Sequence, residues 1–248
     1  MILIVGSGGN GQTKFMEKLK KYFHINNIND RDRIKHIPSP NVQKIRQLSR
    51  LNKISKCIFL YNDPFNSVCS HFRRRWQKIQ INKLGNYYKL NNYNLSSIDK
   101  YFSLVEIRKK DLYSIEYQFN HWYNASQNPK KYGINFPILF VNFSNINKKQ
   151  LSIFLNRKEE LFNISINKNR KNKYNHIISK WPKAKKIYDD LYDKMKKITD
   201  SHNKKLIESI INFRDNTSKN NTSKNNTLIK KTEIKKTLDS NNSSSIII

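Results

Sequence analysis

The sequence predicts a three-layer α/β fold in which a central parallel sheet is flanked by helices. Three short segments, each rich in β-branched residues and apolar nearly throughout, carry this prediction: Ile2–Val5, Cys57–Tyr61 and Ile138–Phe143. Segments of this length and character are typical of parallel strands that are buried on both faces. The stretches between them have helical spacing, and strands that alternate with helices indicate an α/β domain.

Apolar residues at steps of three or four predict the helices, because this spacing places them on one helical face. The sets are Phe15, Leu19 and Phe23; Leu112, Ile115, Phe119 and Trp122; and, after Pro182, Ile187, Leu191, Met195, Ile198, Leu206 and Ile210. The last set predicts a long C-terminal helix packed on the domain, with a partner helix for oligomerisation as the alternative.

The composition changes near residue 213 and divides the chain into two parts. From there the sequence is largely Asn, Ser, Thr and Lys, and the string TSKNN occurs twice. Such a segment buries too little apolar surface to offset its ordering entropy, so residues 213–248 are predicted to be a disordered tail. Residues 1–212 are predicted to form a single α/β domain.

The chain is strongly basic. Its 248 residues include 48 Lys and Arg against 18 Asp and Glu, which gives a net charge of +30. The tail holds 7 basic and 3 acidic residues, so residues 1–212 carry +26. This surface is expected to attract polyanions nonspecifically. The alternative is a compositional bias, since Lys, Asn and Ile have AT-rich codons and indicate an AT-rich genome, such as that of a protist or large virus.

Several features predict a cytoplasmic protein without a membrane span. No apolar segment approaches the roughly 20 residues of a spanning helix. The N-terminal MILIVGSGG lacks the basic region of a signal peptide. Cys57 and Cys69 are the only cysteines, which suits a reducing compartment, and both are expected to be buried. The His and Cys residues show no metal-ligand spacing, so no metal is expected.

The first strand leads directly into a glycine loop, Gly6-Ser7-Gly8-Gly9-Asn10-Gly11-Gln12-Thr13. Glycines let backbone N–H groups approach a phosphate, and the following helix N-terminus adds donors and a positive dipole end. Two templates fit. One is the dinucleotide fingerprint G-x-G-x-x-G, which requires an acid such as Asp30 or Asp32, although HINNIN before them is a poor strand. The other is a P-loop with Gln12 in place of Lys. A tight turn without a ligand is the third reading.

A second motif follows the second strand, where Asn62-Asp63-Pro64 precedes Ser70. Together the two motifs resemble the sulfotransferase family, which has a P-loop NTPase-like fold and uses 3′-phosphoadenosine 5′-phosphosulfate as its donor. In that family the glycine loop binds the 5′-phosphosulfate. The strand followed by Arg, Asp or Asn, Pro and a later Ser binds the 3′-phosphate.

Three further segments resemble the family in the same order. Arg33–Pro38 is similar to the segment that ends in Lys-Thr-His-Leu-Pro and carries the family's catalytic His. Phe136–Phe143 is similar to a later strand, and Arg170-Lys171-Asn172 to an Arg-Lys-Gly phosphate clamp. The resemblance extends over about residues 1–175.

The resemblance implies transfer of a sulfuryl group to the hydroxyl of an unidentified acceptor, which could be a sugar, a small alcohol or phenol, or a protein tyrosine. The amides of residues 8–13 and the Thr13 hydroxyl would hold the 5′-phosphate. The 3′-phosphate would lie against Asn62, Ser70, Arg170 and Lys171. His36 would accept the proton of the acceptor hydroxyl. The alternative for His36 is a surface histidine before a loop proline.

Two departures from the family remove positive charge. Gly9 stands where the family has Lys or Arg, and Asn62 stands at the position of an Arg. Each lost charge-assisted hydrogen bond costs about 1.5–3 kcal/mol. Lys14 is expected to reach back toward the donor, and one of Arg73–Arg75 to replace the missing Arg.

Three functions therefore stay open: a sulfotransferase, a protein of the same fold that binds an anion or nucleic acid without efficient transfer, and a dinucleotide-binding oxidoreductase. His121 and Trp122 are expected to pack in the core, with a place in the acceptor pocket as the alternative.

Overall fold

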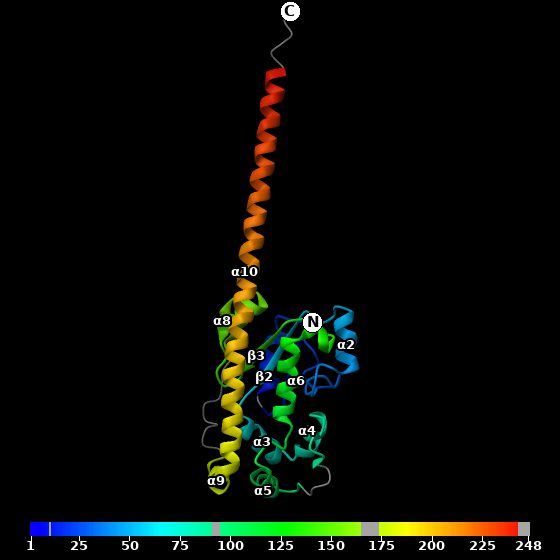
Figure 1. The fold of residues 1–248 in the computed structure, drawn as a ribbon, viewed down its shortest axis with the longest axis vertical. Helices are drawn as coiled ribbons and strands as arrows, with labels where there is room; N and C mark the ends of the chain where they lie inside the picture. Colours follow the sequence, from blue (N-terminus) through cyan, green and yellow to red (C-terminus); the bar gives the residue numbers. More distant parts are fainter. Residues whose placement is uncertain (10, 91–94, 165–173, 243–248) are drawn as a thin grey trace, which may run out of the picture. The chain divides into compact units, whose positions relative to one another are not determined.

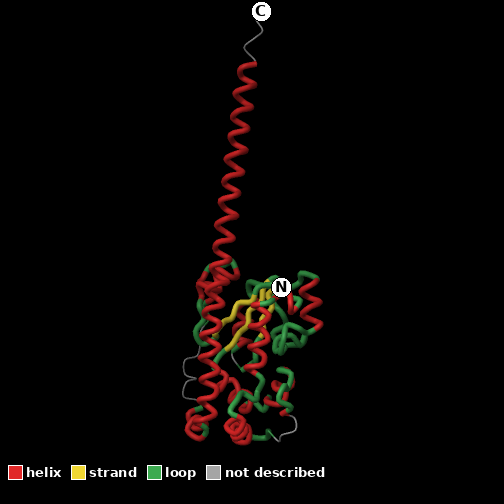
Figure 2. The backbone as a smooth tube through the Cα atoms, in the orientation of Figure 1, coloured by secondary structure: helices red, strands yellow, loops and turns green. Residues whose placement is uncertain are grey.

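The computed structural model describes residues 1–9, 11–90, 95–164 and 174–242, with side chains up to residue 217. The chain divides into two units, Met1–Asn203 and Lys204–Ile248. Figures 1 and 2 show the first unit as a small sheet surrounded by helices.

Three parallel strands form the sheet, in the order β1-β2-β3. They are β1 (Ile2–Val5), β2 (Lys56–Tyr61) and β3 (Ile138–Asn142), within a residue of the predicted segments. Nearly every strand residue is buried. The predicted parallel sheet, buried on both faces, is therefore confirmed.

The edge of β1 that faces away from β2 is covered by the segment around Ile25 and Asn26. Ile2 forms a single parallel bridge with Ile25, and its N–H donates to the carbonyl of His24 at 2.8 Å. Further along, the Asn26 side chain accepts from the N–H of Ile4 at 2.7 Å and donates to its carbonyl at 3.1 Å. A side-chain amide thus replaces a strand there, which explains why HINNIN lacks a strand pattern.

Helices lie on both faces of the sheet, as predicted. On one face, Phe59 and Phe140 pack against Phe119 of α6, with ring centroids 6.0 and 5.7 Å away. Successive side chains of a strand point to opposite faces, so Lys56 lies on the other face from Phe59. There its ammonium lies 5.4 Å from the ring of Phe154 in α8. The helices of the first unit are α1 (Gln12–Lys20), α2 (Gln43–Arg50), α3 (Pro64–Arg73), α4 (Gln77–Lys83), α5 (Ile98–Arg108), α6 (Ile115–Gln127), α7 (Pro129–Tyr132), α8 (Lys148–Leu155), the 3-10 helix η2 (Glu159–Phe162) and α9 (Asn175–Lys180).

The predicted long C-terminal helix is confirmed as α10 (Pro182–Asn242). In the first unit, its Tyr188 hydroxyl donates to Asp111 at 2.9 Å, and its Thr199 hydroxyl lies 2.7 Å from that of Tyr61. The helix continues past residue 212, where the sequence predicts a disordered tail. Residues 183–242 contain neither Gly nor Pro, so no residue there blocks helical continuation. Disorder of residues 213–248 in solution stays a prediction.

Other predictions concern buried residues. Cys57 and Cys69 are free and buried, as expected. Trp122 packs fully in the core, and its indole N–H donates to the carbonyl of Ile37 at 3.2 Å. His121 is half-buried rather than in the core, and its ring packs on Tyr117, with centroids 4.2 Å apart. In the part of the chain with described coordinates, no helix has the length and apolar character needed to cross a membrane.

Candidate functional site

The glycine loop between β1 and α1 requires its glycines. Gly8, Gly9 and Gly11 have φ values of +79°, +66° and +86°, which side chains rarely adopt. A Cβ added at Gly9 would lie 2.9 Å from the carbonyl oxygen of Ser67, and one at Gly11 would overlap the ring of Phe143. The loop therefore packs closely against neighbouring elements, and it delivers α1 with its first-turn N–H groups at the carboxyl edge of the sheet.

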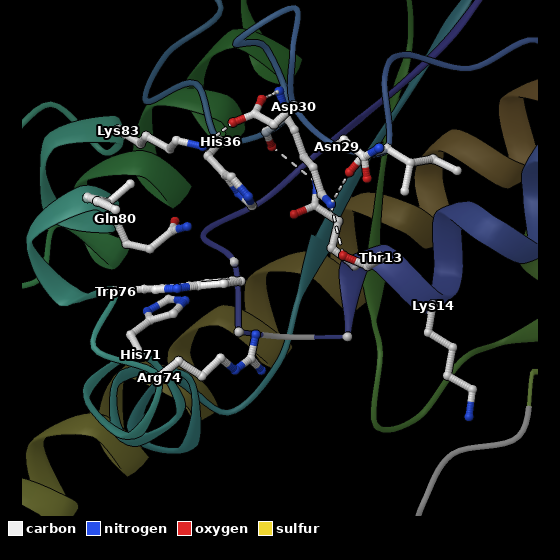
Figure 3. A pocket seen from close by; sticks show the side chains of 17 residues that line it. Thr13, Lys14, Asn29, Asp30, His36, His71, Arg74, Trp76, Gln80 and Lys83 are labelled. Carbon is white, nitrogen blue, oxygen red and sulfur yellow. Dashed lines mark hydrogen bonds and ion pairs between the residues drawn. The ribbon is translucent and has the colours of Figure 1, made fainter.

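A cavity of about 540 Å³ opens beside this loop (Figure 3). Three chain segments line it: the loop with the start of α1, residues 28–36, and the end of α3 with α4. Among the described residues, its lining holds one carboxylate, that of Asp30, and four cationic side chains: Lys14, Lys35, Arg74 and Lys83. This excess of positive charge favours an anionic ligand.

Lys35 supplies a cation that the glycine-loop sequence lacks. Its ammonium donates to the Thr13 hydroxyl at 3.0 Å and to the carbonyl of Ile28 at 2.7 Å. The residue is 4% exposed, and burial lowers the pKa of its ammonium, whereas the charge of Asp30 raises it. Sequence reasoning missed Lys35, although its place directly before His36 was the available signal.

Gln12 has a structural role in place of the expected P-loop Lys. Its side-chain amide donates to the carbonyl of Ile4 at 3.2 Å and to that of Lys35 at 3.1 Å. The N–H of Gly6 also donates to the carbonyl of Lys35, at 3.1 Å. These bonds fasten the segment that carries Lys35 to the glycine loop.

His36 lies against the same loop. Its Nδ1 is 2.8 Å from the carbonyl of Gly6. Because a carbonyl only accepts, we assign the ring proton to Nδ1 and the lone pair to Nε2. Burial lowers the pKa of His36 to about 4, so the ring is neutral at pH 7. The residue is 8% exposed, so the alternative of a surface histidine is wrong.

A second imidazole, that of His71 in α3, reaches the loop from the other side. A Cβ added at Gly9 would lie 3.0 Å from its Nε2. The ring stacks on Tyr113 at 5.3 Å, and within the described residues its buried Nδ1 has no hydrogen-bond partner. Burial, together with the charges of His36 and Arg74, lowers the pKa of His71 to about 3. Sequence reasoning missed this residue as well.

The signal for His71 was the helical spacing of polar residues in α3 and at Arg74, the residue that follows it. Ser67, Ser70, His71 and Arg74 stand at steps of three or four, which places them on one face. The Ser70 hydroxyl accepts from the guanidinium of Arg74 at 2.7 Å. Of the three consecutive arginines, Arg74 is the one that lines this cavity.

Among the other predicted site residues, Asn62 lies away from the cavity and Lys14 stands at its rim. The side-chain oxygen of Asn62 accepts from the N–H of Asp63 at 2.9 Å and from the Ser144 hydroxyl, and Asn62 does not line the cavity. Lys14 is exposed at the cavity rim, and Figure 3 shows its chain pointing away from His36 and Thr13. The predicted binding residues Asn10, Arg170 and Lys171 lie outside the described residues.

The two acids expected by the dinucleotide reading accept hydrogen bonds from backbone N–H groups of the loop around Lys35. Asp30 accepts from the N–H of Lys35 at 3.0 Å and forms an ion pair with Lys83. Asp32 accepts from the N–H of Asn27 at 2.8 Å. Both carboxylates thus hold the loop that carries Lys35, and Asp30 also lines the cavity.

Comparisons with known proteins give no relative. No protein-family model matches the chain, and no curated protein or solved structure matches it significantly. Within the described residues, no three His, Cys, Asp or Glu side chains come together as ligands for a metal ion. The functional reading therefore rests on the glycine loop, the buried Lys35 and the two neutral imidazoles.

Proposed function

We propose that this protein transfers a sulfuryl group from 3′-phosphoadenosine 5′-phosphosulfate to the hydroxyl of an acceptor, on a fold of the P-loop NTPase type. One observation carries the proposal. Two consecutive residues are held on the glycine loop, Lys35 by the Thr13 hydroxyl and His36 by the Gly6 carbonyl. A cation and a neutral base therefore stand side by side at an anion site.

This arrangement suits group transfer. The acceptor oxygen attacks sulfur, and the bond between sulfur and the 5′-phosphate oxygen breaks, leaving 3′-phosphoadenosine 5′-phosphate. Lys35 and the first-turn N–H groups of α1 stabilise the charge on the transferring group. His36 Nε2 takes the proton that the acceptor hydroxyl loses.

Ligand charge is expected to tune the two groups. Nearby cations, Lys35 and Lys83, contribute to the low pKa of His36. A bound anion opposes this effect, so it raises the pKa of His36 toward neutral pH, where a general base works best. The same anion favours the charged form of Lys35.

The test is calorimetric titration of the full chain with 3′-phosphoadenosine 5′-phosphate, with ATP and NAD for comparison. We expect selective binding of the 3′-phosphorylated ligand, and about a tenfold or larger loss of affinity in Lys35→Met, because a charge-assisted hydrogen bond is removed. Lys130→Met, which removes an exposed lysine in α7, is the matched control. Equal affinity for all three nucleotides, or an unaffected Lys35→Met variant, contradicts the proposal.

A second candidate function is anion binding without transfer. The observation that favours it is the position of Asn62, which bonds Ser144 and leaves the cavity without the Arg that the family uses for the 3′-phosphate. Selective nucleotide binding with no sulfuryl transfer to a panel of alcohols and phenols would support this reading. His36→Ala tests catalysis directly, because transfer at an unchanged rate would exclude the proposed base.

A further inference from the structure

Two large apolar side chains are exposed at the cavity on the side of α3 and α4. Trp76 is 48% exposed and Ile79 is 55% exposed, and both line the cavity. Of the well-exposed large apolar side chains among the described residues, these are the two that do so. In Figure 3, Trp76 lies beside His71 and Arg74, across the cavity from Thr13 and Asn29.

The turn between α3 and α4 fixes the position of Trp76. The N–H of Trp76 donates to the carbonyl of His71 at 3.0 Å, and that of Arg75 donates to Phe72 at 3.0 Å. This pair of bonds is a Schellman motif, which requires a left-handed residue, here Arg75 with φ +59°. The carbonyl of Trp76 then accepts from the N–H of Gln80 at 2.9 Å. The two residues that form these backbone hydrogen bonds with Trp76, His71 and Gln80, line the same cavity.

Planar and polar groups surround the indole. The guanidinium of Arg74 lies 5.5 Å from the centre of the Trp76 ring. Gln80 is 5% exposed, and its Oε1, which has no hydrogen-bond partner within the described residues, lies 3.0 Å from a Cβ added at Gly8. An exposed indole beside a flat cation, next to the proposed anion site, is typical of a surface that stacks a flat ring.

We infer that Trp76, with Arg74 and Ile79, binds a flat aromatic ring of the ligand whose anionic group lies on the glycine loop. This inference rests on the proposed function and adds to the anionic group of the ligand a second recognised part, an aromatic ring. The ring is either the adenine of the donor or an aryl group of the acceptor. Stacking on an aromatic side chain raises affinity for a base by about 5- to 150-fold.

The test compares probes with and without a ring on the full chain: pyrophosphate and ribose 5-phosphate against 3′-phosphoadenosine 5′-phosphate and phenyl phosphate, with adenosine as a neutral ring. We expect at least one ring-bearing anion to bind tenfold or more tightly than the ringless anions and to quench tryptophan fluorescence. In Trp76→Leu the preference should fall to within about twofold, while pyrophosphate affinity changes by less than twofold. Trp181→Leu is the matched control, because that indole bonds Asp99 and lies outside the cavity lining.

The two sources of the ring are separated by order of addition. If adenine occupies the surface, 3′-phosphoadenosine 5′-phosphate quenches Trp76 and blocks further quenching by 4-nitrophenol. If an aryl acceptor occupies it, the nucleotide leaves Trp76 fluorescent and 4-nitrophenol quenches it in the saturated complex.

Failure of this inference is distinguishable from failure of the proposed function. If anions bind without a preference for a ring, or if the preference survives in Trp76→Leu, the inferred ring-binding role of Trp76 is overturned and the proposed function is not. Adenosine binding that depends on Trp76, with no binding of any anion, supports the ring surface and overturns the proposed function. If no probe binds, both are overturned.

Discussion

The two sides of the cavity differ in how far their polar groups are already satisfied. On the side of residues 28–36, Lys35 bonds Thr13 and Ile28, and Asp30 bonds the Lys35 N–H and Lys83. On the side of α3 and α4, His71 Nδ1 and Gln80 Oε1 have no partner within the described residues. The first side therefore holds the positive charge of Lys35 in a fixed position, and such a charge suits many anions. The second presents the exposed side chains of Trp76 and Ile79 to the cavity, so selectivity is expected to come from there.

The largest effect is expected at the loop that both sides share. In Gly11→Ala the new Cβ meets the ring of Phe143 and the residue keeps a φ of +86°, so we expect a loss of about 2–4 kcal/mol in the free energy of unfolding. The measurement is urea denaturation. Gly85→Ala is the control, because its φ is +89° but its added Cβ would lie 3.5 Å from Pro38. Equal losses in both variants would show that close packing of the loop contributes nothing.

A smaller effect is expected on the pH dependence of stability, to which each side of the cavity contributes one imidazole, that of His36 or that of His71. Their pKa values are lowered to about 4 in His36 and about 3 in His71, so the unfolded chain binds more protons as the pH falls below about 6.5. Stability therefore decreases toward acid, by about 2 kcal/mol for each ring between pH 7 and pH 5.

The measurement is denaturant unfolding at both pH values for the wild type, His36→Gln and His71→Gln. Each substitution should remove about 2 kcal/mol of the pH-dependent loss, whatever its effect at pH 7. His24→Gln is a control in an exposed loop, outside the cavity. If either buried variant keeps the wild-type pH dependence, that imidazole is accessible to protons and its side of the cavity is more open than the structure has it.

The smallest effect on stability is expected in the turn between α3 and α4, at Arg75. Arg75 is exposed and has a φ of +59°, which costs a side-chain-bearing residue about 1–2 kcal/mol. Arg75→Gly should therefore stabilise the protein by up to about 1 kcal/mol, measured as a rise in Tm. Arg75→Ala removes the same charge and keeps the strained conformation, so it should give no such rise. A larger gain from Ala than from Gly would contradict the proposed Schellman turn.

Much of the fold follows from local sequence. The three strands and the start of α10 lie where β-branched segments and Pro182 predict them, because burial on both faces of a parallel sheet demands continuous apolar runs. The glycine loop was also visible, since positive φ values and close backbone packing restrict the choice of residue.

Tertiary structure decided which side chains meet at that loop. Thr13 and Lys35 are 22 residues apart, and His71 reaches Gly9 from another helix, so no local periodicity connects them. Gln12, which the sequence marked as a missing lysine, bonds backbone carbonyls, and Asn62 bonds Ser144 outside the cavity. The sequence by itself determined a sheet and a loop able to receive an anion. The resemblance also pointed to His36. Long-range packing chose the cation Lys35, the second imidazole, that of His71, and the indole of Trp76, because burial and the satisfaction of polar groups depend on neighbours distant in the chain.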